Sequence, residues 1–200
     1  MSGRVATGGG GPARRRAGAL RLRTGSLGDA PTVARVMRAA IRGLGAAPHT
    51  GAELRAWSSL PALYHRWAMT VGGERYVVAE RDGVVVGYAA RRGSELTAVF
   101  VLPRAAGGGV GSALVRHAER AARRAGAPRL RVLAALGAVP FYARLGFEPG
   151  SAARAPLPGG TALAAVRMEK RLDRDRSSAK DAPEKDRGFR RTDAAPPLVR

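Results

Sequence analysis

The stretch "VFVLPRAAGGGVGSAL", residues Val99 to Leu114, places a β-branched run, a proline and four glycines directly ahead of an amphipathic segment. A strand that passes through glycines into a helix directs several unpaired backbone N–H groups and the positive end of the helix dipole at one place. Such a place favours an anion, above all a phosphate. By themselves the glycines also fit a flexible segment, because the chain contains 27 of them.

Two nucleotide-binding motifs with glycine-rich loops fit this stretch poorly. In a P-loop a lysine follows the glycines to reach the terminal phosphates, and none follows here. A dinucleotide-binding Rossmann unit begins with a strand, a helix and a parallel strand, whereas the strands predicted before this loop form a meander. The next predicted strand, residues 129–135, also lacks the acidic residue that binds a ribose.

The pattern around the loop predicts one α+β domain with a mixed, mostly antiparallel sheet of six to seven strands flanked by helices. Strands are predicted at residues 20–25, 75–81, 84–92, 95–103, 129–135, 146–150 and 161–172. Helices are predicted at residues 30–45, 53–60, 110–126 and 139–146, and a further helical piece is predicted after Pro61.

Several local signals support these elements. Asp82-Gly83 between two β-branched runs predicts a tight hairpin. Ser26 and Thr50 each precede an acidic residue by three positions, which is the capping pattern of a helix start. In the helix after the glycines, the spacing predicts Arg116 and Glu119 on the solvent side.

Composition predicts the limits of the domain. Residues 1–19 are rich in Arg and Gly, and residues 173–200 alternate charges with Ser, Pro and Gly, so both are expected to be disordered tails around a domain at 20–172. The arginine-rich start lacks the amphipathic apolar residues of a mitochondrial presequence.

The formal charge of +20 does not by itself indicate a nucleic-acid or membrane partner, since 32 of the 35 basic residues are arginine in a chain rich in Ala and Gly. Aromatic residues make up only 5%, and the basic residues are scattered. No apolar run is long enough to span a membrane, so a soluble, cytoplasmic protein is expected. Without cysteine, and with three scattered histidines, no metal site is expected.

Two motifs resemble the signatures of the GNAT N-acetyltransferase superfamily. The first is "VFVLPRAAGGGVGSAL", and the second, about thirty residues on, is "AVPFYARLGFEP". The segment "PHTGAELRAW" is similar to a bacterial branch in which a helical pair shapes the acceptor pocket. The resemblance covers Leu20 to Leu172 and implies the GNAT fold, with acetyl-CoA as acyl donor and no metal.

The resemblance implies that acetyl-CoA lies between the strands at 95–101 and 129–135, with its pyrophosphate on the glycine loop. The residues implied in cofactor binding are Val99, Phe100, Val101, Gly107, Gly108, Gly109, Val110, Gly111, Ser112 and Phe141. This chain departs from the pattern at Ala106, where Arg or Gln is usual, at Gly108, where a second Arg is common, and at Ala135, where Asn is frequent. Arg104 offers a substitute donor, or is a solvated loop charge.

Acetyl transfer needs a neutral nucleophile, stabilisation of an oxyanion and a proton for the thiolate. The resemblance places the phenol of Tyr142 toward the thioester sulfur as the acid; the alternative is packing beside Phe141. Glu95 matches the spacing of a catalytic Glu in histone-type members and is the candidate base, directly or through water. A backbone N–H of residues 99–101 is the expected oxyanion donor.

His49 and Trp57 are the candidate acceptor-binding residues, with Tyr64 and His65 as possible additions to the same pocket. The sequence thus predicts an N-acetyltransferase that moves an acetyl group to a primary amine of a small molecule or peptide by direct attack, as a monomer or homodimer. The alternative is a catalytically weak or inactive GNAT-fold module that binds acyl-CoA or regulates. A nucleic-acid binder ranks last.

Overall fold

The dipeptide Asp82-Gly83 forms the turn that sets the register of a central hairpin. Both residues have positive φ, 50° and 73°, which a two-residue hairpin turn requires. Arg81 pairs with Val84 directly across the turn. The hairpin predicted from these two residues is therefore confirmed.

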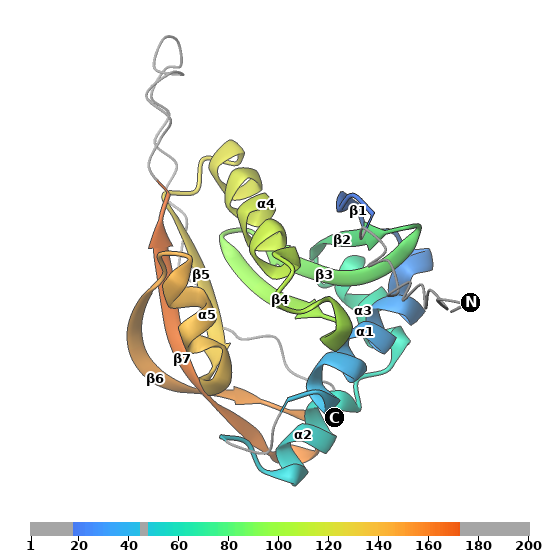
Figure 1. Cartoon of the computed structure of the whole chain (residues 1–200). Helices are drawn as coiled ribbons and strands as arrows, with labels where there is room; N and C mark the ends of the chain where they lie inside the picture. Colours follow the sequence, from blue (N-terminus) through green and yellow to red (C-terminus); the bar gives the residue numbers. More distant parts are fainter. Residues whose placement is uncertain (1–17, 45–47, 173–200) are drawn as a thin grey trace, which may run out of the picture.

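The computed structural model describes residues 18–44 and 48–172 (Figure 1). Within them, seven strands form one mixed sheet in the order β1-β2-β3-β4-β5-β7-β6. Every neighbouring pair is antiparallel except β4 and β5, which are parallel. The strands are β1 (Arg21–Thr24), β2 (Arg75–Arg81), β3 (Val84–Arg92), β4 (Glu95–Val101), β5 (Arg129–Ala135), β6 (Glu148–Pro156) and β7 (Ala162–Arg171).

Five α-helices of the described residues cover the two faces of this sheet (Figure 1). They are α1 (Ala30–Arg42), α2 (Gly51–Ser58), α3 (Ala62–Met69), α4 (Val110–Arg124) and α5 (Val139–Arg144). The element order and fold class agree with the prediction. The tails predicted at 1–19 and 173–200 lie outside the described residues, apart from positions 18 and 19. No helix of the described ranges is long and apolar enough to cross a bilayer.

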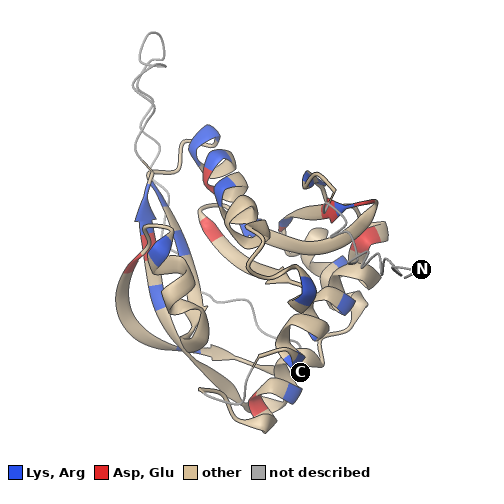
Figure 2. Cartoon of the chain, in the orientation of Figure 1, with Lys and Arg blue, Asp and Glu red and all other residues tan. Residues whose placement is uncertain are grey.

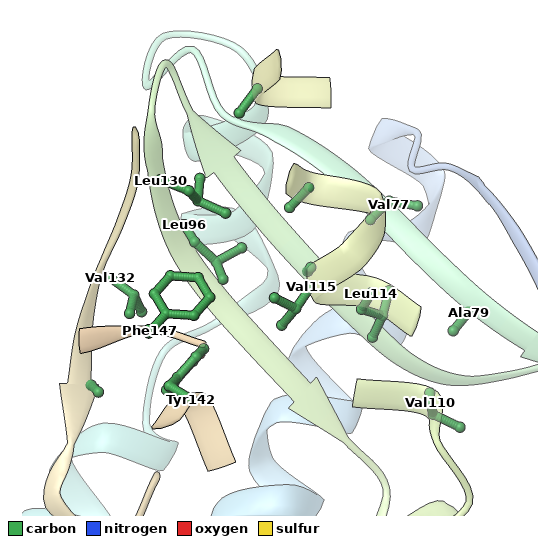
Figure 3. Packing of buried hydrophobic residues seen from close by; sticks show 14 of the residues in the cluster. Val77, Ala79, Leu96, Val110, Leu114, Val115, Leu130, Val132, Tyr142 and Phe147 are labelled. Atoms are coloured by element: carbon green, nitrogen blue, oxygen red, sulfur yellow. The ribbon is translucent and has the colours of Figure 1, made fainter. Parts of the chain in front are cut away.

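Alternation along β2 divides the core between the two faces of the sheet. Val77 and Ala79 point toward α4, whereas Tyr76 and Val78 point toward α1 and α3. On the α4 side the buried side chains include Leu96, Leu114, Val115 and Leu130 (Figure 3). Each face of the central strands is therefore closed by helices, and neither is left to solvent.

The buried face of α4 is shifted around the helix from the face that its apolar spacing predicts. That spacing predicts Ala121 and Ala125 on the buried side, but Val115 and Ala122 are buried instead. This shift places Glu119 in the interface, only 4% exposed, so its predicted solvent position is wrong. Figure 2 shows acidic and basic positions together on this helix.

The carboxylate of Glu119 is neutralised by Lys170 of β7. The Lys170 ammonium donates to Glu119 Oε1 at 2.8 Å and to the carbonyl of Leu145 at 2.7 Å. Because a charge withdrawn from water needs a partner, this contact accounts for an acidic residue in the interface. The pair joins α4, β7 and the end of α5.

Strand β6 is longer than the predicted strand at 146–150. It runs to Pro156 and pairs with β7, with a register shift between Pro149 and Ala152. Its Gly, Ala and Pro residues have weak strand propensity. Pairing with the adjacent strand, rather than local preference, therefore determines this element.

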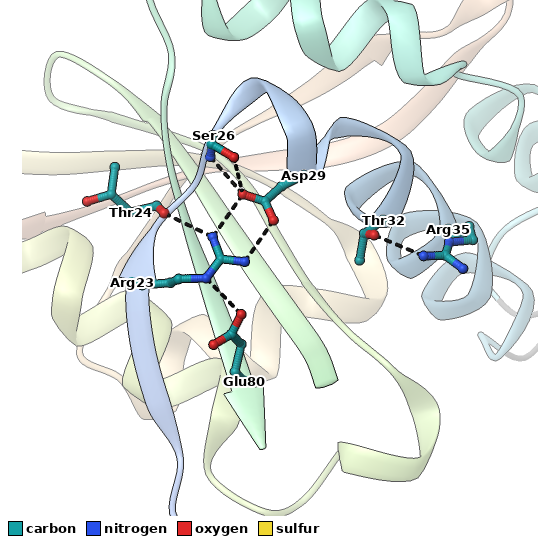
Figure 4. A network of polar contacts seen from close by, with 7 residues as sticks. All are labelled: Arg23, Thr24, Ser26, Asp29, Thr32, Arg35 and Glu80. Atoms are coloured by element: carbon teal, nitrogen blue, oxygen red, sulfur yellow. Dashed lines mark hydrogen bonds and ion pairs between the residues drawn. The ribbon is translucent and has the colours of Figure 1, made fainter. Parts of the chain in front are cut away.

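Arg23 of β1 joins the start of α1 to the sheet (Figure 4). Its guanidinium donates two hydrogen bonds to the carboxylate of Asp29, at 2.8 and 2.9 Å, and one to Glu80 of β2, at 2.7 Å. Asp29 also accepts from the backbone N–H and the hydroxyl of Ser26. These donors, Arg23 first, hold the pKa of Asp29 well below its usual range.

We expect Arg23→Met to lower the free energy of unfolding at pH 7 by on the order of 1 kcal/mol, because two charge-assisted contacts are lost at a site that solvent partly screens. Asp29 contributes this stability above its unfolded pKa, near 4, and loses it as the pH falls toward the lower folded value. The difference between wild type and variant should therefore shrink below about pH 4 in urea titrations.

Arg35→Met is the matched control for this prediction. Within the described part of the chain, the single hydrogen bond of the Arg35 guanidinium goes to the Thr32 hydroxyl on the same helix, at the surface (Figure 4). It is expected to change stability by less than about 0.5 kcal/mol. A pH-independent loss in the Arg23 variant would contradict the assigned role of Asp29.

Candidate active site

The parallel contact between β4 and β5 lasts for only two residue pairs. Glu95 lies opposite Arg131 and Leu96 opposite Val132, and beyond them the strands separate. Strand β4 continues to pair with β3 and β5 continues to pair with β7. The rest of the β4 edge, toward Val101, is consequently free of a strand partner on the β5 side.

The glycine loop lies at the end of β4 and leads into the fifteen-residue helix α4. Gly107 and Gly109 have φ of 74° and 77°, a left-handed conformation that residues with a side chain rarely adopt. Of the backbone hydrogen bonds in the described chain, none is donated by the amides of residues 107–112. Six N–H groups at a helix start are therefore free to bind an anion.

Arg81 closes the outer side of this loop. Its guanidinium donates to the carbonyl of Gly108 at 2.9 Å. A Cβ atom at Gly108 would come within 3.2 Å of the Arg81 Nη1 atom. Because Gly108 has no side chain, the Arg81 guanidinium can reach the backbone of the loop.

A groove of about 790 Å³ runs along the free edge of β4 and over the glycine loop; we call it the loop groove. Its walls come from β4, the loop, the start of α5 and the segment between α1 and α2. Gly111 lets α4 approach α5 here, because a Cβ atom would lie 3.1 Å from the ring of Phe141. Residues that line the groove include Val99, Phe100, Val101, Ala106, Gly107, Gly109, Val110, Gly111, Ser112, Ala135, Phe141 and Arg144.

A second cavity, of about 320 Å³, lies between the sheet and α2, α3 and the end of β6. All four tyrosines of the chain line it, so we call it the tyrosine cavity. Three charged residues also reach it: Glu74, Arg92 and Glu95. Its lining includes Trp57, Tyr64, His65, Tyr76, Tyr88, Phe100 and Tyr142.

The loop groove and the tyrosine cavity meet at the point where β4 and β5 have separated. The residues that line both are Trp57, Val99, Phe100, Ala135 and Ala138. Molecules bound in the two spaces would face each other across this shared wall. The arrangement suits a reaction between two substrates.

A family model described as an acetyltransferase (GNAT) domain matches residues 72–149. The chain therefore has the GNAT acetyltransferase fold, and the family match covers its central segment. The matched residues include the glycine loop and the Phe141-Tyr142 segment. Among curated protein sequences, no match is found.

Solved GNAT structures share this fold. A GCN5-related N-acetyltransferase from Rhodopseudomonas palustris is 27% identical, with a TM-score of 0.72 over 80% of this chain and 100% of that chain. The PaiA N-acetyltransferase from Thermoplasma acidophilum, in complex with coenzyme A, is 18% identical, with a TM-score of 0.61 over 76% and 99%. A putative acetyltransferase from Salmonella typhimurium, with its cofactor acetyl-CoA, is 20% identical, with a TM-score of 0.57 over 83% and 98%.

The GNAT fold brings most of the predicted site residues to these two spaces. The residues expected to bind acetyl-CoA all line the loop groove except Gly108, which faces Arg81. Tyr142 and Glu95 line the tyrosine cavity. Trp57 lies on the shared wall, and His49 lines the loop groove rather than the tyrosine cavity, with its ring 6.1 Å from Trp57.

The two candidate catalytic side chains differ in their surroundings. Tyr142 is 5% exposed and packs edge-on against Phe147, with ring centroids 5.5 Å apart (Figure 3). Burial raises the pKa of its phenol above the ordinary value, so it keeps its proton at neutral pH. Glu95 is half exposed, and Arg92 lies 3.7 Å from its carboxylate.

Sequence reasoning missed several residues of this GNAT site. Arg144 lines the loop groove, whereas Arg104, the expected substitute donor, is not among its lining residues. Glu74, just before β2, and Tyr88 of β3 also line the tyrosine cavity. Inward alternation along the β3 strand could have indicated Tyr88, but no local pattern distinguishes Arg144 from the other arginines.

A buried histidine forms part of the cavity wall. His65 Nδ1 lies 3.1 Å from the hydroxyl of Tyr76, and the His65 side chain is 2% exposed. Burial lowers the pKa of His65 to about 4. The imidazole is therefore neutral throughout the physiological pH range.

We expect His65 to destabilise the fold under mildly acidic conditions. Between about pH 6.5 and the folded pKa near 4, the unfolded chain binds a proton that the native imidazole does not, so the free energy of unfolding falls as pH falls. His65→Phe should remove a slope of about 1 kcal/mol per pH unit in that range, measured by urea denaturation. Parallel stability curves for wild type and variant would contradict the assignment.

Proposed function

We propose that the protein is an acetyl-CoA-dependent N-acetyltransferase that transfers the acetyl group to a primary amine by direct attack. The observation that carries this proposal is the shared wall between the loop groove and the tyrosine cavity, at Val99, Phe100 and Trp57. One space has donors for a phosphate-bearing cofactor, and the other has carboxylates and tyrosines for an amine. GNAT relatives of the same fold carry coenzyme A or acetyl-CoA, which agrees with this assignment.

The loop groove fits acetyl-CoA. The free amides of residues 107–112 and the start of α4 suit its pyrophosphate. The unpaired edge of β4 from Val99 to Val101 offers backbone groups to the amides of the pantetheine arm. Ala106 has no polar side chain for the phosphates, but Arg144 lines the same groove and supplies a cation there.

When bound, acetyl-CoA supplies a thioester whose carbonyl carbon forms a bond to the amine nitrogen as its bond to sulfur breaks. A backbone N–H of residues 99–101 stabilises the negative charge that develops on the carbonyl oxygen. Tyr142 donates a proton to the sulfur as it leaves, and its high pKa keeps that proton available at neutral pH.

The proton that the amine loses passes to water. The candidate base Glu95 precedes Val99 by four positions on β4, about 13 Å along an extended strand, so it receives this proton only through a chain of water molecules. Trp57 forms the wall between cofactor and acceptor, and His49 holds the Trp57 ring from the groove side.

The second candidate function is a GNAT module that binds acyl-CoA weakly and acts by regulation. Two observations favour it: Ala106 and Ala135 line the loop groove with methyl groups, where polar side chains would strengthen cofactor binding. The two functions differ in whether thiol is released from acetyl-CoA in the presence of amines.

Acetyl-CoA is expected to raise the melting temperature of the protein, because a ligand that binds only the folded state at a hundred times its Kd adds about 2.7 kcal/mol to the stability. Arg144→Ala should weaken acetyl-CoA binding by about tenfold through the loss of one charge-assisted contact, measured by calorimetric titration. Arg104→Ala, at an exposed arginine outside the groove lining, is the control and should bind like wild type. Absence of any thermal shift in wild type would exclude acetyl-CoA as the ligand.

Tyr142→Phe should lower kcat by about a hundredfold while the Kd for acetyl-CoA stays within about twofold of wild type, because the phenol acts on the leaving sulfur and the ring still packs on Phe147. Steady-state thiol release and calorimetry measure the two quantities separately. An unchanged kcat would refute the role of Tyr142 as the acid.

A further inference from the structure

Glu74, just before β2, extends a carboxylate into the tyrosine cavity that the proposed chemistry does not use. It is partly buried, and within the described ranges of the chain it takes part in no ion pair. Arg92, a cation on the same cavity, is paired with Glu95. Burial raises the pKa of Glu74, although Thr97, Tyr76 and Arg92 partly oppose this, and the nearby Glu95 raises it further.

A row of aromatic rings connects this carboxylate to the shared wall. The ring of Trp57 lies 5.7 Å from that of Phe100, Phe100 lies 5.6 Å from Tyr88, and Tyr88 stacks on Tyr76 at 5.7 Å. Glu74 lies close to Tyr76, and its charge adds to the effect of burial in raising the pKa of Tyr76. A molecule that reaches from the shared wall to Glu74 would therefore run along the rings of Phe100, Tyr88 and Tyr76.

Two buried polar atoms of the same cavity lack partners. The hydroxyl of Tyr88, fully buried, and Nε2 of His65, on a side chain 2% exposed, form no hydrogen bond with the described residues. Both residues line the tyrosine cavity. Unpartnered polar atoms inside a protein are costly, so these two atoms mark the wall of this cavity as a place where a bound molecule or water would add hydrogen bonds.

We propose that the acceptor is an extended aliphatic diamine or polyamine whose distal ammonium binds Glu74 while its other amine, at the shared wall, accepts the acetyl group. This inference rests on the proposed function. The distal nitrogen forms no covalent bond and keeps its protons. A cation at Glu74 neutralises a carboxylate that is otherwise withdrawn from water without an ion-pair partner.

The walls between the two ends fit the rest of such a molecule. Tyrosine and phenylalanine faces attract a nearby ammonium and bury an alkyl stem. Glu95, next to Glu74, gives this end two carboxylates against the one guanidinium of Arg92. An acceptor with a distal carboxylate would meet like charge there.

The test compares diamines with monoamines of the same length by thiol release from acetyl-CoA. Wild type should use diaminohexane with a kcat/KM at least about tenfold above that of hexylamine, and ethylenediamine, too short to reach Glu74, should show no such advantage over ethylamine. Glu74→Gln should remove the preference for diaminohexane through KM, with kcat for hexylamine changed less than about twofold. Equal use of diaminohexane and hexylamine by wild type, or a preference that survives in Glu74→Gln, overturns the proposal.

Glu148→Gln, at an exposed acidic residue of β6 outside both spaces, is the matched control and should keep the wild-type preference. The melting temperature of Glu74→Gln should equal or exceed that of wild type, because a neutral amide replaces a carboxylate without an ion-pair partner. If wild type acetylates no amine, the proposed function fails, and calorimetric titration with diaminohexane alone then decides the site. If wild type binds diaminohexane and Glu74→Gln does not, the assignment of the site is supported. If both proteins bind it equally, or if wild type does not bind it, the proposal is overturned.

Discussion

The separation of β4 from β5 after Leu96 is the constraint on which the rest of the site depends. Each strand also pairs along its other edge, β4 with β3 and β5 with β7, so the sheet survives the break between them. The helices close the two faces but leave this break open. Both the loop groove and the tyrosine cavity exist because of it, and Val99 and Phe100 belong to both.

The two spaces have opposite polarity although they share a wall. Backbone N–H groups and Arg144 line one, and they favour anions. Glu74 and Glu95 reach the other, among tyrosine rings that favour cations. A cofactor rich in phosphate and an amine would therefore enter from different sides, and the electrostatics of the molecule oppose an exchange of their places.

Features determined by nearest neighbours in sequence could be predicted, and features determined by packing could not. The Asp82-Gly83 turn, the Thr50 cap and the glycine loop each depend on a few adjacent residues, and the structure contains all three. The prediction that Glu119 faces solvent was wrong because the buried face of α4 depends on packing against other elements. Lys170 of β7 pairs with the Glu119 carboxylate in that interface. Most residues predicted to bind the cofactor gather in one groove because they follow one motif. No such motif surrounds Glu74 or Arg144. The surroundings of these two side chains depend on segments that are distant in the sequence.

The contact between Arg81 and the carbonyl of Gly108 affects the electrostatic potential at the surface of the glycine loop. A peptide loop normally offers acceptors as well as donors, and an acceptor that pointed at a phosphate would repel it. Here Arg81 occupies the carbonyl of Gly108, and the amide of Ala113 occupies that of Gly109. Donors within the protein therefore occupy two of the loop's acceptors, whereas the amides of residues 107–112 have no backbone acceptor among the described residues. This imbalance makes the glycine loop more favourable to an anion, although the glycines carry no charge.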